Sequence, residues 1–308
     1  MTIESTNWTP DAFRHRFVVA NGVRLHVAEA GNTGPLVLLL HGFPECWASW
    51  IPVMGRLVDA GFRVAAPDMR GYGTSEKPRG VGAYRWDALT GDIHGLVDAL
   101  GERQVHLVGH DWGAIVAWMT VMDDASRYSH LTICNVPHPA HFTRMALDPT
   151  QLRRSWYIAW FQLPRVPERT LQRDDHALLR RVLKADRIPG TLDPALLELQ
   201  IEAATQPGAL TAMLNYYRAM VRQGPRAVTR RLRRITVPTI VCWGQRDRAL
   251  GVDYAAPPTA WVPDCEVRRF PDASHWVQVD RPDAVARAIR DLHERDRVGA
   301  RERQATDP

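Results

Sequence analysis

The stretch that most constrains the fold of this chain is residues 105–117, where a short apolar run leads through Gly-His-Asp-Trp-Gly into a second apolar run. The first run contains β-branched residues and is typical of a buried strand, and the second is typical of a buried helix. Gly109 and Gly113 carry no side chains, so the backbones of the strand and the helix can pass close to each other. The sequence therefore predicts a sharp strand-to-helix turn that presents the carboxylate of Asp111.

A carboxylate at such a turn is suited to displacement at a saturated carbon. Attack by Asp111 on an alkyl carbon gives an alkyl ester, and water can attack the carbonyl of that ester in a second step. A serine in the same place would give an ether, which water does not readily cleave. Asp111 therefore favours a two-step covalent reaction and argues against a protease, a lipase or an ordinary esterase.

Strand and helix signals alternate on both sides of this turn. Continuous apolar runs such as residues 36–40 are typical of strands buried on both faces of a parallel sheet. The alternation lapses in the middle of the chain, where several aromatic residues lie in predicted helices. We therefore expect an α/β fold with a mostly parallel sheet, helices on both faces and an inserted helical cap. The expected divisions are a first part of the sheet domain at residues 1–136, the cap at 137–234, the second part at 235–296 and a flexible charged tail at 297–308.

The composition argues against several classes of partner. The net charge is +5, but the basic run at residues 226–234 lacks the stacking aromatics or reading motif of a nucleic-acid site. No apolar run approaches the roughly 20 residues of a membrane-spanning helix, and no leader-like segment opens the chain. The cysteines are scattered, with no metal-binding spacing. We therefore expect a cytoplasmic protein with no nucleic-acid or membrane partner, no metal and no cofactor.

Two polar residues follow later strands in the chain order of a catalytic triad. Asp247 comes directly after the strand predicted at residues 238–243, and His275 comes after the strand predicted at residues 265–270. Because the carboxyl ends of parallel strands meet at one edge of a sheet, we expect both side chains near Asp111. His275 would then activate water, and Asp247 would orient the imidazole and stabilise its protonated form.

Backbone N–H groups are expected to stabilise the negative charge that water attack places on the ester carbonyl. The candidates for this oxyanion hole are Phe43, in His-Gly-Phe-Pro, and Trp112, which follows the predicted nucleophile. His41 and His110 flank the same two turns, and we expect them to support these turns structurally.

Taken together, these motifs resemble the α/β-hydrolase-fold epoxide hydrolases of the soluble type. The resemblance extends over about residues 17–292 and is carried by His-Gly-Phe-Pro-Glu at 41–45, Gly-Tyr-Gly-Thr-Ser at 71–75, Gly-His-Asp-Trp-Gly at 109–113, Asn-Val-Pro-His-Pro at 135–139 and Ser-His-Trp at 274–276. It implies an α/β-hydrolase fold, a small apolar or aryl epoxide and water as substrates, and a vicinal diol as product. It also implies a monomer or homodimer with a role in detoxification.

The resemblance further implies two cap tyrosines that donate hydrogen bonds to the epoxide oxygen. In the family, the first tyrosine stands four residues before the Phe of a Phe-Gln motif, which corresponds to Tyr157. The second precedes Arg in an Asn-aromatic-Tyr-Arg motif, which corresponds to Tyr217, with the adjacent Tyr216 as the alternative. A phenol is neutral at pH 7 and can donate such a hydrogen bond. The expected walls of an aromatic substrate pocket are Trp112, Trp156 and Trp276.

Two other functions are compatible with parts of this pattern. A haloalkane dehalogenase uses the same Asp, His and Asp chemistry, but that family typically places Asn after His-Gly, where this chain has Phe43. Fluoroacetate dehalogenases place Arg after the nucleophile, where this chain has Trp112. A ligand-binding protein of the same fold without catalysis is an alternative of another class, although such proteins usually lose a triad residue.

Overall fold

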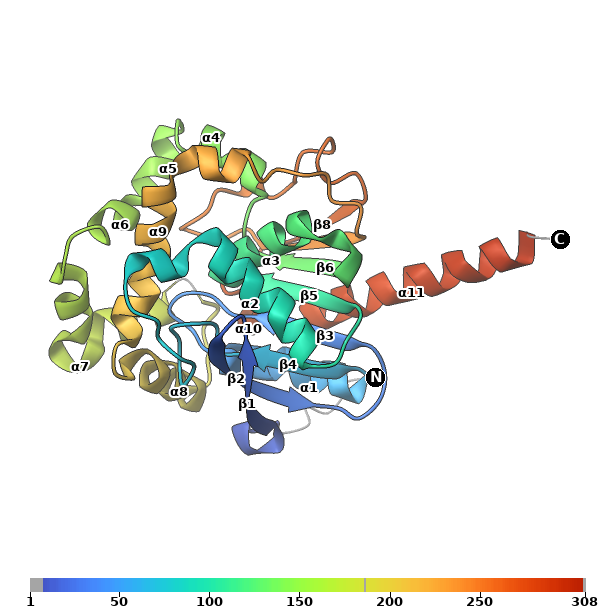
Figure 1. Ribbon diagram of the computed structural model, residues 1–308, viewed down its shortest axis with the longest axis horizontal. Helices are drawn as coiled ribbons and strands as arrows, with labels where there is room; N and C mark the ends of the chain where they lie inside the picture. Colours follow the sequence, from blue (N-terminus) through green and yellow to red (C-terminus); the bar gives the residue numbers. More distant parts are fainter. Residues whose placement is uncertain (1–7, 186, 307–308) are drawn as a thin grey trace.

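A mostly parallel sheet of eight strands forms the centre of the protein (Figure 1). The computed structural model describes the backbone of residues 8–185 and 187–306, and the side chains of these residues up to 295. The strand order is β1-β2-β4-β3-β5-β6-β7-β8. Only the pairs β1–β2 and β2–β4 are antiparallel among the described strands. The strands are β1 (Arg14–Ala20), β2 (Val23–Ala30), β3 (Leu36–Leu40), β4 (Arg63–Pro67), β5 (Val105–His110), β6 (Tyr128–Cys134), β7 (Thr239–Gly244) and β8 (Cys265–Phe270).

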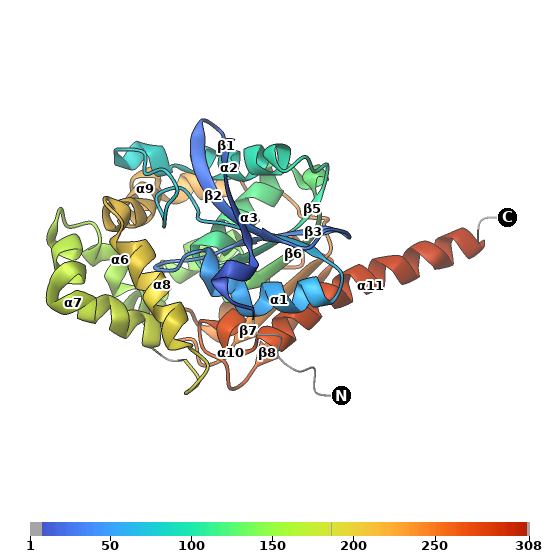
Figure 2. The ribbon, with the colours of Figure 1, turned by 90° about the horizontal axis from the view of Figure 1, so that it is seen from below.

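Helices cover both faces of this sheet, as the sequence predicted. Successive residues of a strand point to opposite faces, and in β3 the side chain of Leu38 packs in one apolar core while that of Leu39 packs in the other. Figure 2 shows α2 (Trp86–Ala99) and α3 (Trp112–Asp123) on one side of the sheet, and α1 (Ile51–Asp59) and α11 (Pro282–Thr306) on the other. Short helical turns complete the sheet domain: η1 (Pro10–Ala12), η2 (Trp47–Trp50), η3 (Val81–Tyr84), η4 (Ala125–Arg127), η6 (Val252–Tyr254) and α10 (Val277–Asp280).

The last helix is longer than the sequence suggested. The sequence places the end of the sheet domain at residue 296, because few apolar residues follow, but α11 continues to Thr306. Its final turns project from the body of the protein (Figure 1). The tail predicted at residues 297–308 therefore includes helical residues of α11. The last two residues of that tail lie outside the described part of the chain.

A group of helices lies between β6 and β7, within the segment predicted to form a cap. These helices are η5 (Pro139–His141), α4 (Phe142–Met145), α5 (Pro149–Arg154), α6 (Trp156–Trp160), α7 (Val166–Lys184), α8 (Pro194–Thr205) and α9 (Ala209–Thr229). Figures 1 and 2 show most of them gathered at one end of the sheet. No described helix is both long enough and apolar enough to span a membrane.

Candidate active site

Asp111 lies on the turn between β5 and α3 in a conformation that few side chains adopt. Its φ of 48° and ψ of −121° fall outside the ordinary regions for a residue with a side chain. Such backbone strain costs about 1–3 kcal/mol and is concentrated at functional sites. A Cβ atom at Gly42 would overlap the Asp111 side chain, and one at Gly113 would overlap the backbone of Leu40. These two glycines therefore allow the turn to pack against the loop that follows β3.

His275 lies between two carboxylates. Its Nδ1 is 2.7 Å from Oδ2 of Asp247, which is a hydrogen-bond distance. Its Nε2 is 3.6 Å from Oδ2 of Asp111, which leaves an ion pair but is too long for a hydrogen bond. The side chains of all three residues are largely buried. The structure thus brings together the three residues that the sequence predicted to form a triad.

The two carboxylates decide the charge of the imidazole. Burial by itself lowers the pKa of His275, but the charge of Asp247 and the interactions with Asp111 raise that pKa more strongly, to about 10. Burial likewise raises the pKa of Asp111, but His275 lowers it more, so the net shift is downward. At neutral pH the site therefore holds an imidazolium between two carboxylates.

The predicted oxyanion donors lie next to Asp111. The backbone N–H of Phe43 donates to Oδ1 of Asp111 at 2.6 Å, and the peptide bond between Phe43 and Pro44 is cis. Trp112 is the first residue of α3, so its N–H belongs to the helix terminus, where N–H groups have no partner within the helix. Oδ1 of Asp111 therefore faces the N–H of Phe43, and Oδ2 faces His275.

A cavity of about 520 Å³ opens over Asp111 and His275 and contains the two predicted tyrosines. Tyr157, from α6, and Tyr217, from α9, both line it, and their ring centroids are 6.0 Å apart. Burial and then the nearby charge of Asp111 raise the pKa of both phenols. Both hydroxyl groups are therefore neutral at pH 7 and can act as hydrogen-bond donors.

The structure distinguishes the two adjacent tyrosines of α9. The hydroxyl group of Tyr216 donates to the backbone carbonyl of Arg70 at 2.8 Å, and its ring packs against Tyr72 and Tyr84. Tyr216 is not part of the cavity lining, whereas Tyr217 is. Tyr216 is therefore a packing residue.

The three predicted aromatic walls have different positions. Trp112 lines the cavity beside Asp111, and Trp156 lines it with 63% of its surface exposed. Trp276 does not lie in this lining. Its indole N–H donates to the backbone carbonyl of Ala185, and the guanidinium of Arg187 stacks on its ring. Trp276 adjoins His275 in sequence, but its side chain points in another direction.

Comparison with known proteins places this geometry in a family. Residues 35–282 match the family described as alpha/beta hydrolase fold. The chain is 40% identical over 281 residues to the AB hydrolase superfamily protein YfhM of Bacillus subtilis, across 91% of this chain and 97% of that protein. It is 36% identical over 273 residues to Epoxide hydrolase 4 of Mus musculus, across 86% of this chain and 75% of that protein. The chain belongs to the α/β-hydrolase-fold epoxide hydrolases.

Solved structures of epoxide hydrolases have the same fold. A mutant of the epoxide hydrolase of Bacillus megaterium, solved with its naphthyloxy-propane-1,2-diol product, has a TM-score of 0.82 and 28% sequence identity. The likeness covers 91% of this chain and 100% of that chain.

Sequence reasoning missed a residue that holds the acid of this epoxide hydrolase site. Asn135 follows β6 with a φ of 49°, and its Nδ2 donates to Oδ2 of Asp247 at 2.8 Å. Its Oδ1 accepts from the N–H of Gly244 at 2.8 Å. Asn135 thus fixes the carboxylate of Asp247 toward His275. The position of Asn135 directly after a predicted parallel strand could have indicated that it lies near Asp247.

Replacing Asn135 with alanine is expected to reduce stability and turnover together. The change leaves the buried N–H of Gly244 without the acceptor Oδ1 of Asn135 and removes one of the donors to Oδ2 of Asp247, which costs about 1–3 kcal/mol. A less restrained Asp247 also orients His275 less well, so we expect kcat to fall more than KM rises. Denaturant unfolding and steady-state kinetics measure both effects.

The matched control is Asn135→Gly, which removes the same amide but tolerates the positive φ. It should be more stable than Asn135→Ala and equally slow. Wild-type turnover in both variants would show that Asn135 does not position Asp247.

A second missed contact ties the loop of Phe43 to the site. Glu45 is fully buried and accepts from Nδ1 of His110 at 2.8 Å, and Gln278 donates to the same carboxylate. The other ring nitrogen of His110 lies 3.0 Å from the backbone carbonyl of His275. A structural role was predicted for His110, and these contacts connect the carboxyl end of β5 to the loops that carry Phe43 and His275.

Proposed function

We propose that this protein hydrolyses small apolar or aryl epoxides to vicinal diols through a covalent ester on Asp111. The observation that carries the proposal is the shared cavity, in which two neutral phenols, Tyr157 and Tyr217, lie over Asp111 and His275. An epoxide oxygen becomes an alkoxide when its ring opens, and it then requires donors of this kind. A leaving halide requires no proton.

In the first step, Oδ2 of Asp111 attacks one epoxide carbon and the bond from that carbon to the ring oxygen breaks. The ring oxygen takes the bonding electron pair and receives a proton from Tyr157 or Tyr217, which gives a hydroxyalkyl ester. Oδ1 becomes the ester carbonyl oxygen, because it already accepts the hydrogen bond from Phe43. The negative charge of Asp111 disappears in this step.

The loss of that charge prepares the second step. Interactions with Asp111 are part of what raises the pKa of His275, so esterification lowers that pKa. The imidazolium then gives up its proton, which restores the phenol of the tyrosine that protonated the ring oxygen, and the neutral imidazole is left as a base. Neutral His275 then takes a proton from water, which attacks the ester carbonyl, while Asp247 stabilises the imidazolium. The N–H groups of Phe43 and Trp112 stabilise the oxyanion, and the intermediate collapses to the diol and Asp111.

The cavity supports apolar and aryl substrates. Its walls include Trp112, Ile115, Val136 and Leu250, and most of its other lining side chains are apolar. A relative of known structure yields a naphthyloxy diol, and we infer that aryl epoxides fit here as well. Residues 137–234 would act as the cap that closes this cavity over the sheet.

A paired assay on one preparation tests this function. The protein is expected to convert styrene oxide and trans-stilbene oxide to diols and to release no halide from short bromoalkanes. Diol is measured by chromatography and halide by a colorimetric assay.

Asp111→Asn serves as the inactive control in both assays. Halide release without diol formation would assign the protein to the haloalkane dehalogenases. Stoichiometric ligand binding without either product would indicate a binding protein.

A further inference from the structure

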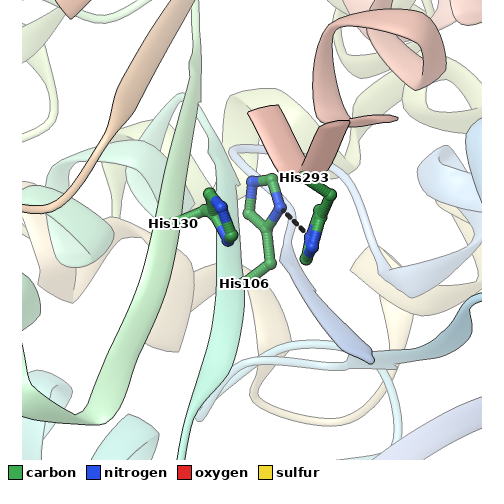
Figure 3. Close-up of side chains that lie close together, drawn as sticks. All are labelled: His106, His130 and His293. Carbon is green, nitrogen blue, oxygen red and sulfur yellow. Dashed lines mark hydrogen bonds between the residues drawn. The ribbon is translucent and has the colours of Figure 1, made fainter. Parts of the chain in front are cut away.

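Three histidines that the proposed reaction does not use lie together on the face of the sheet covered by α11 (Figure 3). His106 is the second residue of β5, and its partner in the parallel register is His130 of β6. His293 comes from α11. The cluster lies near the amino-terminal ends of these two strands, while Asp111 follows the carboxyl end of β5. It is therefore separate from the site that holds His275.

The spacing of the ring nitrogens suits a single metal ion. One ring nitrogen of each histidine lies within 4.8 Å of the others. Nδ1 of His106 and Nε2 of His293 are 3.0 Å apart, close to the roughly 3.3 Å that separates two ligands of tetrahedral zinc at Zn–N distances of about 2.0–2.1 Å. To complete a face of the tetrahedron, the third nitrogen must come closer to the other two, because the three lie only within 4.8 Å of one another.

Neighbouring hydroxyl groups orient two of the three rings. Nε2 of His106 lies 2.8 Å from Oγ1 of Thr132, and Nδ1 of His130 lies 3.0 Å from Oγ of Ser129. Partners of this kind fix the ring and leave the opposite nitrogen as the ligand atom, as they do around metal-binding histidines generally. When Nε2 of His106 carries the proton and donates it to Thr132, Nδ1 presents its lone pair to the cluster.

We propose that His106, His130 and His293 form a binding site for a divalent transition metal ion of the zinc type. Imidazole nitrogens suit zinc, nickel and copper, and His293 is only partly buried, so a water molecule can take the fourth position. The ion would fasten α11 to β5 and β6, far from the catalytic carboxylates. No metal-binding spacing in the sequence marks this site, because its ligands come from three separated positions of the chain.

Calorimetric titration of the tag-free, chelator-treated protein with Zn²⁺ tests the proposal. We expect one Zn²⁺ ion to bind per chain and to raise the Tm of the protein. An ion that binds only the folded state stabilises that state against unfolding. His293→Gln, at the partly exposed position, should weaken binding about 10-fold or more and remove the rise in Tm. Co²⁺ added to the wild type should produce the visible absorption of a four-coordinate site, and this absorption should be lost in the variant.

Two control variants separate this site from other histidines. His15→Gln disrupts another close pair, in which the ring nitrogens of His15 and His26 are 2.9 Å apart. His275→Gln removes the imidazole of the triad. Both should bind Zn²⁺ as the wild type does. His130→Gln provides a second test of the cluster, with circular dichroism to establish that it folds.

The proposal is overturned by the absence of stoichiometric binding, or by equal binding in the wild type and a folded His293→Gln protein. Loss of binding in His275→Gln alone would also overturn it, because the metal would then occupy the triad. These readouts do not depend on the proposed hydrolysis of epoxides.

Discussion

Replacing Asp111 with asparagine is expected to lower epoxide turnover by roughly 10⁴-fold or more, because Asp111 is the only carboxylate among the residues that line the cavity. The amide occupies nearly the same volume as the carboxylate, so the positive φ at this turn and the contacts of Gly42 remain possible. Substrate should still enter the cavity. The loss therefore falls on kcat, and steady-state diol formation measures it.

The same substitution is expected to change the titration of His275. In the wild type, the two carboxylates raise the pKa of this imidazole to about 10. The stabilising effect of the charged imidazole is then fully present below about pH 6.5, its ordinary pKa, and is lost as the pH rises through 10. Without the charge of Asp111, the pKa of the folded state falls, so the stabilising effect is smaller and its loss is complete at a lower pH. NMR titration of the imidazole and unfolding at several pH values measure this shift.

Trapping the covalent ester provides the control for the role of Asp111 as the nucleophile. His275→Gln should still form the ester but hydrolyse it slowly, so mass spectrometry should find the enzyme heavier by the mass of the substrate. The double variant with Asp111→Asn should carry no such adduct. Rapid turnover by Asp111→Asn, without conversion of the new side chain back to aspartate, would exclude Asp111 as the nucleophile.

Much of this arrangement was predictable from local sequence, because it follows from chain order and strand ends. The apolar run of β3 and the Gly-x-Asp-x-Gly turn predicted a parallel sheet with Asp111 at its carboxyl edge. Asp247 and His275 follow β7 and β8, so sheet topology alone brings them to the same edge. Their catalytic roles remain predictions for the variants above.

Side-chain direction and long-range contacts were not predictable in this way. Trp276 is adjacent to His275 in sequence, yet its indole points to Ala185 rather than into the cavity. Tyr216 and Tyr217 are neighbours on α9, and successive residues of a helix point about 100° apart, so only the packing of the helix shows which one faces Asp111. The contact of Asn135 with Asp247 spans 112 residues, and no spacing rule reports it.

The double substitution Tyr157→Phe and Tyr217→Phe is expected to slow epoxide opening by about 10²–10⁴-fold, the usual contribution of a positioned proton donor. Both rings remain, so the edge contacts of Tyr217 with Phe43 and Trp112 and the fold itself should persist. Each single variant should retain part of the activity, because one phenol still faces the ring oxygen. Single-turnover kinetics of ester formation measure the opening step directly.

Tyr216→Phe is the matched control, since it removes a phenol from the adjacent position of the same helix. Its hydroxyl group donates to the carbonyl of Arg70, so the variant should lose about 0.5–1.5 kcal/mol of stability and keep the opening rate. A double variant that opens epoxides at the wild-type rate would reduce Tyr157 and Tyr217 to packing residues and would remove the observation on which the epoxide assignment depends.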